Sequence, residues 1–208
     1  MRTIHAGGRT LFRRFGLLPC LLCLPLLLGA GCTRTPDTTW FVLDSDIATP
    51  PVDKAKGPRL QIRKPDIPAY LDRNAIVTRE GGGVRLKLAE FYAWAEPLGA
   101  GMQRVLAEVL TPALLEKNVL VQALDDDSGG ALQLFVQVQR FDGILGGEAT
   151  LEARWSLRTD GDVTVARGSF LDKEPSGGSY DTLVQAQSAL LRRMGQALAA
   201  PLAAAAQK

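Results

Sequence analysis

The chain has 208 residues, of which 46% are hydrophobic, with 24 lysines and arginines against 22 acidic residues, so its formal net charge is +2. Residues 1–31 hold the single histidine, two of the three cysteines and four of the arginines, but no acid. Without that segment the chain keeps 20 basic and 22 acidic residues, no histidine and one cysteine. This composition excludes Ser-His and Cys-His nucleophilic sites and zinc sites built from histidine or cysteine. It also lacks the excess of basic residues that is typical of nucleic-acid-binding proteins.

Residues 1–31 have the order of a secretory signal, in which four arginines precede an apolar run at 15–28 and three small residues. The run is too short for a membrane-spanning helix, and two prolines interrupt it. Its end, LLGAGC, resembles the lipobox of bacterial lipoproteins, although Gly29 stands where that motif prefers leucine. We expect a lipoprotein signal peptide over 1–31 and acylation of Cys32; the alternative is an ordinary signal peptide.

The remaining chain, about 177 residues long, suffices for one domain with a core of its own. Because Cys32 is its single cysteine, no internal disulfide can form. We expect a polar tether over residues 32–39, a single domain over 40–202 and a frayed, alanine-rich tail over 203–208.

The first half of the domain contains strand-like runs and one helix. FVLDS and RLQIRK come first, and NAIVTRE and VRLKLAE then flank the glycines at 81–83, a pattern that predicts a hairpin. Apolar residues next recur every three or four positions, with Pro97 in the first turn and Thr111-Pro112 at the end. This spacing predicts a helix over about 96–110.

Four strand-like segments follow, namely NVLVQAL, ALQLFVQVQRF, TLEARWSLR and VTVARGSF. Their alternating apolar residues indicate strands with one buried and one solvent-facing side. In the third segment Glu152, Arg154 and Arg158 share the solvent-facing side. Residues 180–200 then carry one apolar stripe of helical period, made by Leu183, Val184, Leu190, Leu191, Met194 and Leu198.

This order of elements predicts an α+β fold, a two-layer sandwich of a mostly antiparallel sheet with two amphipathic helices on one face. The acidic run DDDSGG at 125–130 lacks the ligand pattern of a calcium loop and is interpreted as a solvated turn. Tyr70, Asp72 and Arg73 cluster in one short segment, for which a packed loop with a local ion pair and a binding role both stay open.

Four segments in this order carry a family resemblance: PDIPAYLDRNAIVTR, FYAWAEPLGAGMQRVLAEVL, GGEATLEARWSL and SYDTLVQAQSALLRRMGQALA. Together, and behind the lipobox, they resemble the PqiC-like ABC-type transport auxiliary lipoprotein family. The similarity spans essentially the whole chain after the signal. The positions that match the family pattern are Pro68, Tyr70, Leu71, Arg73, Trp94, Glu96, Pro97, Leu98, Trp155 and Tyr180.

The resemblance implies a periplasm-facing accessory lipoprotein of MCE/ABC systems, which are thought to move lipids or other hydrophobic molecules across the Gram-negative envelope. Its partners would be an MCE-domain protein that spans the periplasm and, through it, an inner-membrane ABC permease and ATPase. Thr33 in place of Asp implies the outer membrane as the site of the anchor. The resemblance implies no catalysis, cofactor, metal or nucleic acid, and leaves a homo-oligomer open.

We expect Trp155 and Leu98 to lie in the core, and Tyr70, Asp72, Arg73 and Trp94 to be candidates for partner contact. The leading hypothesis is an accessory, tethering subunit of the transport system. Its alternative is a stand-alone outer-membrane lipoprotein that binds lipid or a β-barrel. An enzyme with a Ser-Lys pair is the least favoured hypothesis, given the residues that remain.

Overall fold

The structure, a computed structural model, describes residues 35–48, 57–81, 83–124 and 132–207. Residues Asp37–Lys208 form one compact unit. The expected signal peptide, Cys32 and the acidic run at 125–130 lie outside the described residues. Lipidation of Cys32 therefore stays a prediction.

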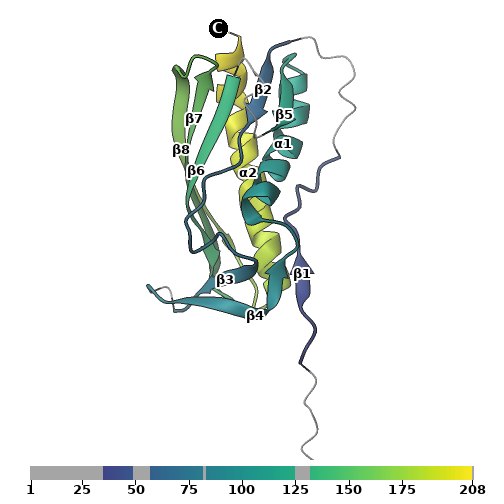
Figure 1. Ribbon diagram of the computed structural model, residues 1–208, viewed down its shortest axis with the longest axis vertical. Coiled ribbons are helices and arrows are strands. Elements are labelled where there is room, and N and C mark those ends of the chain that lie inside the picture. The colour runs from purple at the N-terminus through teal and green to yellow at the C-terminus, as the bar shows by residue number, and fades with distance from the viewer. Residues whose placement is uncertain (1–34, 49–56, 82, 125–131, 208) are drawn as a thin grey trace, which may run out of the picture. The chain divides into compact units, whose positions relative to one another are not determined.

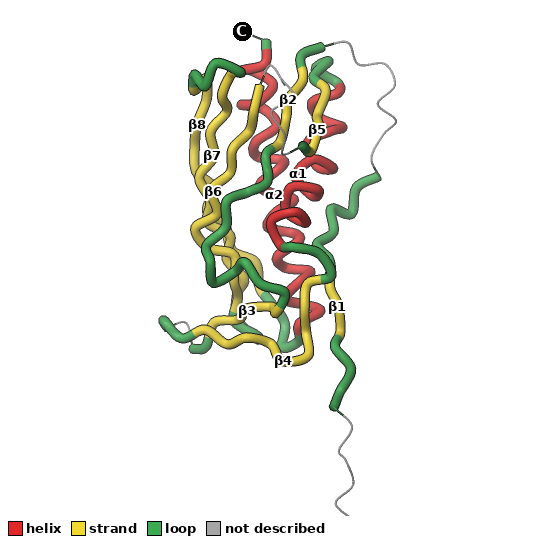
Figure 2. The backbone as a smooth tube through the Cα atoms, in the orientation of Figure 1, coloured by secondary structure: helices red, strands yellow, loops and turns green. Residues whose placement is uncertain are grey.

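The described elements are one sheet of eight strands and two helices (Figure 1, Figure 2). The strands are β1 Thr39–Phe41, β2 Arg59–Ile62, β3 Ala75–Arg79, β4 Leu86–Trp94, β5 Leu120–Ala123, β6 Leu132–Gly143, β7 Glu148–Thr159 and β8 Thr164–Pro175. The helices are α1 Leu98–Leu115 and α2 Tyr180–Ala206. The predicted α+β class is confirmed.

The sheet is mixed, and the expectation of a mostly antiparallel sheet was wrong. Among the described residues, β1 with β4, β2 with β5, β2 with β6 and β3 with β6 are parallel pairings. The pairings β3 with β4, β6 with β7 and β7 with β8 are antiparallel. Alternation of apolar and polar residues shows that a strand has one buried face, but it does not reveal the direction of the neighbouring strand.

Strands β3 and β4 form the hairpin that the glycines at 81–83 predict. Thr78 pairs with Lys87 in antiparallel register. Gly81 has a φ of 58°, a left-handed conformation that glycine adopts without a steric penalty. Gly81 therefore serves the geometry of the turn.

Both helices are longer than the periodicity predicts. Helix α1 continues through Pro112, which lies in its last turns, because Leu110 and Leu114 beside it are fully buried. Helix α2 continues past residue 200 to Ala206, so the tail expected from residue 203 is helical over 203–206. Leu202, which is 1% exposed, holds this end on the core.

The N-terminus of α2 has a capping box. The Ser179 hydroxyl accepts a hydrogen bond of 3.3 Å from the backbone N–H of Thr182, and the Thr182 side chain bonds back to the backbone of Ser179. Asp181 places a negative charge in the first turn, where the helix dipole favours it. This cap fixes the residue at which α2 begins.

One continuous core joins the inner side of the sheet to both helices. Helix α2 contacts β6, β7 and β8, whereas α1 contacts α2, β5 and β2 (Figure 1). The helices approach closely at Gly195, because a Cβ there would stand 2.6 Å from Cγ1 of Val109. All six residues of the predicted α2 stripe are buried, which confirms that prediction.

Of the two residues expected in the core, Leu98 is 3% exposed, and Trp155 is partly buried against the core. Trp155 lies opposite Gly168 in the β7–β8 register. A Cβ at Gly168 would stand 2.9 Å from atoms of the Trp155 indole, so the glycine makes room for the ring.

Candidate partner-binding surface

The segment between β2 and β3 follows the edge of β6. The Arg63 N–H donates to the Leu134 carbonyl at 3.0 Å, and the Asp66 N–H donates to the Val136 carbonyl at 2.9 Å. The Asp66 carbonyl in turn accepts from the Val138 N–H at 2.8 Å. Backbone pairing therefore fixes the path of the chain up to residue 66.

The chain then turns over residues 68–73, which we call the PAYLDR loop. The Leu71 N–H donates to the Pro68 carbonyl at 2.8 Å, and the Arg73 N–H donates to the Leu71 carbonyl at 2.8 Å. The Leu71 side chain is 2% exposed and belongs to the core. Burial of Leu71 thus fixes the middle of the loop. The polar residues around it range from half-buried to exposed.

A second anchor is the carboxylate of Asp142, near the end of β6, which is fully buried. The Tyr70 hydroxyl donates to its Oδ2 at 3.0 Å. Arg79 of β3 donates at 3.1 Å from Nε and at 2.7 Å from its terminal nitrogen, and Arg140 donates to Oδ1 at 2.9 Å. We call these four residues the Asp142 cluster. It ties the PAYLDR loop to two strands of the sheet.

The electrostatics of the Asp142 cluster keep the acid ionised and the phenol neutral. Burial by itself raises the pKa of the Asp142 carboxyl, but hydrogen bonds from Arg79 and Arg140 outweigh it, so this pKa lies below its usual value. Burial, and then the charge and hydrogen bond of Asp142, raise the pKa of Tyr70 to about 12. Tyr70 therefore remains a hydrogen-bond donor to an anionic acceptor over the whole physiological pH range.

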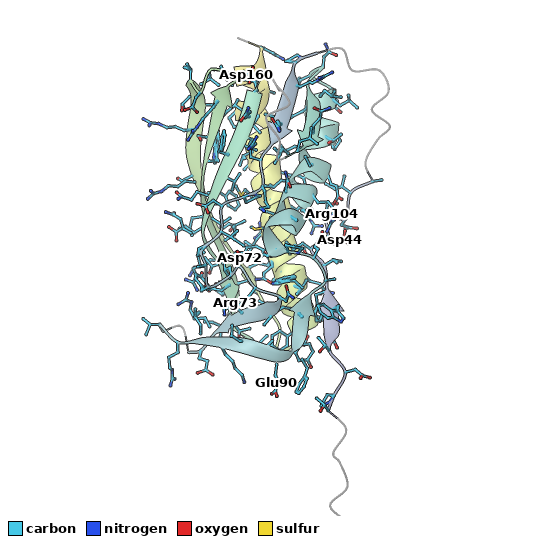
Figure 3. All side chains as sticks on the ribbon, viewed as in Figure 1. Asp44, Asp72, Arg73, Glu90, Arg104 and Asp160 are labelled. Carbon is cyan, nitrogen blue, oxygen red and sulfur yellow. The ribbon has the colours of Figure 1, made fainter. Side chains whose placement is uncertain are left out.

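The structure separates the four residues that the sequence suggested as partner contacts. Asp72 and Arg73 are exposed at the end of the PAYLDR loop (Figure 3), where an Arg73 guanidinium nitrogen donates to the Ala69 carbonyl at 3.2 Å. Tyr70 is half-buried and holds the loop through Asp142. Trp94 is 5% exposed in the core, so its side chain does not reach the surface.

Next to the loop, the outer face of β6, β7 and β8 carries a groove with a volume of about 690 Å³. Phe135 contributes an aromatic ring, and the Arg158 guanidinium lies over it at 4.5 Å from the ring centroid. The charged residues that line the groove are Lys64, Asp66, Arg154, Arg158 and Arg167. Four cations and one carboxylate make this surface basic.

The chain sequence gave no reason to associate Arg79, Arg140 and Asp142 with Tyr70. They come from β3 and β6, which are 63 residues apart at the Arg79–Asp142 contact, and only the strand pairing brings them together. Part of the groove could be predicted from the sequence, because the alternation of residues along β7 predicted that Arg154 and Arg158 face solvent. That Arg167 joins them depends on the register between β7 and β8.

This surface offers cations, serine hydroxyls and an aromatic ring, which suit recognition of another molecule. Among residues 35–48, 57–81, 83–124 and 132–207, no group of three or more His, Cys, Asp or Glu side chains is placed to hold a metal ion. Within the same residues, neither helix is long and apolar enough to cross a membrane.

One comparison with known proteins identifies a family. A model of the family described as "ABC-type transport auxiliary lipoprotein component" matches residues 41–199. No curated protein sequence matches the chain.

Two crystal structures share the fold. One is of a Xanthomonas campestris protein described by the family DUF330, with a TM-score of 0.66, 18% identity, and coverage of 82% of this chain and 97% of that one. The other is of an uncharacterized protein, with a TM-score of 0.65, 19% identity, and coverage of 80% of this chain and 99% of that one.

Proposed function

From the premise that this chain belongs to the ABC-type transport auxiliary lipoprotein family, we propose that it is an accessory subunit of an ABC/MCE-type transport system. In this proposal acyl chains on Cys32 hold the protein on the outer membrane, facing the periplasm, and the folded domain binds an MCE-domain partner. The system would move lipids or other hydrophobic molecules. The lipobox and Thr33 support the anchor and its location, and more than one acyl chain makes such anchoring stable.

The single observation that carries the binding role is the construction of the PAYLDR loop. Its exposed charged residues, Asp72 and Arg73, lie on a segment that is fixed by Leu71 in the core and by the hydrogen bond of Tyr70 to Asp142. A surface held in one conformation before binding loses little conformational entropy when a partner docks. Arginine is also among the residue types enriched at interface hot spots.

A carrier that itself holds lipid is supported less well. Such a carrier needs a mostly apolar cavity. The groove of about 690 Å³ on the outer face of the sheet is instead lined by four cations. We therefore favour tethering and partner binding over lipid storage in this domain.

The test is a charge swap on the loop, Asp72→Lys with Arg73→Glu, measured by co-purification of the MCE partner from cross-linked membranes. The matched control is the swap Glu80→Lys with Arg85→Glu, an exposed pair whose nitrogen and oxygen are 3.7 Å apart on the β3–β4 turn. Both variants keep the net charge. We expect the loop variant to lose the partner and the control to retain it, with unchanged circular dichroism and melting for both.

Two results would count against the proposal. If the loop variant folds and still retains the partner, the interface lies elsewhere on the domain. If Cys32→Ser protein stays in the outer-membrane fraction, lipidation is not what anchors the chain.

A further inference from the structure

The cations of the groove form a regular ladder on the outer face of the sheet. In the strand register Arg154 lies beside Gln137 and Ser169, and Arg167 lies beside Ser156, which in turn pairs with Phe135. Arg158 lies in the next row, beside Gln133 and Thr164. The three arginines thus occupy three successive rows on one face, and Lys64 adds a fourth cation at the side of the groove.

The spacing between the arginines of this ladder indicates the kind of ligand that fits it. Successive rows on one face of a strand are two residues apart, or about 6.8 Å at about 3.4 Å per residue. The arginines therefore spread over roughly 14 Å along β7. An extended peptide places every second side chain on one face at the same interval of about 6.8 Å, so it matches the three rows better than a single phosphate or carboxylate does.

The ladder is open to such a ligand. Arg154 and Arg167 are exposed, and the Arg158 side chain is 37% exposed although it pairs with Asp162 at 2.9 Å. The Phe135 ring beneath Arg158 supplies an apolar surface between the charges. Asp66 is the one carboxylate among the residues that line the groove, and Asp162 pairs with Arg158, so the cations of the groove still outnumber these carboxylates.

We propose that the arginine ladder of Arg154, Arg167 and Arg158 binds an extended acidic segment of a partner protein, in which every second residue is Glu or Asp. Each acidic side chain pairs with one rung, because charge-assisted hydrogen bonds between guanidinium and carboxylate are the strong, geometrically specific ones. This site is distinct from the PAYLDR loop, and its test requires neither lipidation nor the transport complex.

The experiment measures fluorescence anisotropy of a fluorescein-labelled TETETET peptide with the full chain in detergent, at low and high salt. The comparison peptide, TTEEETT, has the same composition without the alternation. We expect TETETET to bind more tightly, and its affinity to fall as salt screens the charges. Asp66→Asn should tighten binding, since it removes the carboxylate that competes for the rungs.

The diagnostic variant is Arg154→Glu with Arg167→Glu, and its control is Arg85→Glu with Lys87→Glu, which changes the net charge equally at exposed positions of the β3–β4 hairpin. We expect the ladder variant to lose affinity by about tenfold or more, equivalent to about 1.4 kcal/mol, and to gain binding to TKTKTKT. The control should change affinity by less than about twofold, as remote surface charges do.

Three results would overturn the proposal. One is equal binding of TTEEETT, which would mean that the spacing is irrelevant. Another is equal weakening by the control, which would mean that net charge alone attracts the peptide. The third is concentration-dependent dimers in light scattering that disappear in Asp125→Asn with Asp127→Asn, which would mean that a second copy fills the groove.

Discussion

The two faces of β6, β7 and β8 use alternate residues of the same strands for different purposes. On the inner face Leu134, Ala153 and Leu157 are fully buried beneath the helices. The outer face carries charges of two kinds. Asp142 is fully buried and accepts four hydrogen bonds from three side chains, whereas Arg154 and Arg167 of the ladder are exposed. The difference shows that burial, more than residue type, separates charges that hold the fold from charges available to a partner.

The largest effect is expected on the inner face. Leu190→Asp and Met194→Asp each bury an unpaired carboxylate at a fully buried position of α2. The cost is several kcal/mol, comparable to the whole stability of a typical domain, so we expect loss of the cooperative thermal transition in circular dichroism. Gln196→Asp, at an exposed position of the same helix, is the control. Normal melting of both buried variants would show that α2 does not cover the sheet.

A smaller but still large effect is expected where the outer face is covered. Asp142→Ala removes the acceptor of Tyr70, Arg79 and Arg140 and leaves Arg79 with a side chain only 18% exposed. Breaking one side of a buried ion pair costs about 3–5 kcal/mol in the free energy of unfolding, which urea titration measures. Asp162→Ala, whose side chain is 77% exposed, should cost less than about 1 kcal/mol. If both variants lost the same free energy of unfolding, buried and exposed charges would contribute equally to the fold, which would contradict this account.

The Asp142 cluster also predicts a response at high pH. The pKa of Tyr70 is raised from its ordinary value of 10.0 to about 12 in the folded protein. Neutral Tyr70 therefore contributes its full stabilisation of the fold below pH 10, and this contribution is lost as the pH rises toward 12. Tyr70→Phe removes the titration and costs about 1 kcal/mol at neutral pH through the lost hydrogen bond. We expect the gap between wild type and variant, measured by urea unfolding, to shrink between pH 10 and 12. A constant gap would mean that Tyr70 titrates normally.

The smallest effect on stability is expected from the open ladder. Arg154→Ala and Arg167→Ala should each change the free energy of unfolding by less than about 0.5 kcal/mol, because both side chains are exposed. The same variants should weaken peptide binding. A ladder variant that destabilised the domain as much as Asp142→Ala would assign these arginines to the fold.

Local patterns in the sequence predicted the elements well. The stripe of α2, the hairpin at the glycines and the two-sided strands all depend on residues near one another in the chain, and all appear in the structure. The parallel pairings and the Asp142 cluster depend on contacts between distant segments, which periodicity does not encode. For the same reason Trp94, a candidate contact in the sequence, lies in the core.

The candidate surface could be predicted only in part. Asp72 and Arg73 are exposed, as contact residues must be, while Tyr70 packs and holds the loop through Asp142, and a binding role for these residues stays a prediction. Arg154 and Arg158 could be assigned to the outer face by alternation, but the ladder needed the register of β8.

The most direct test of the central claim, that this protein acts by binding a protein partner through the PAYLDR loop, is site-specific photo-crosslinking in membranes. A photoreactive residue replaces Arg73, and Lys117, also exposed, is replaced for comparison. The account predicts a cross-link from position 73 to a component of an ABC/MCE transport system, identified by mass spectrometry, and none from position 117. Cross-links from 117 but not from 73, or none from either position in membranes that contain the complex, would contradict it.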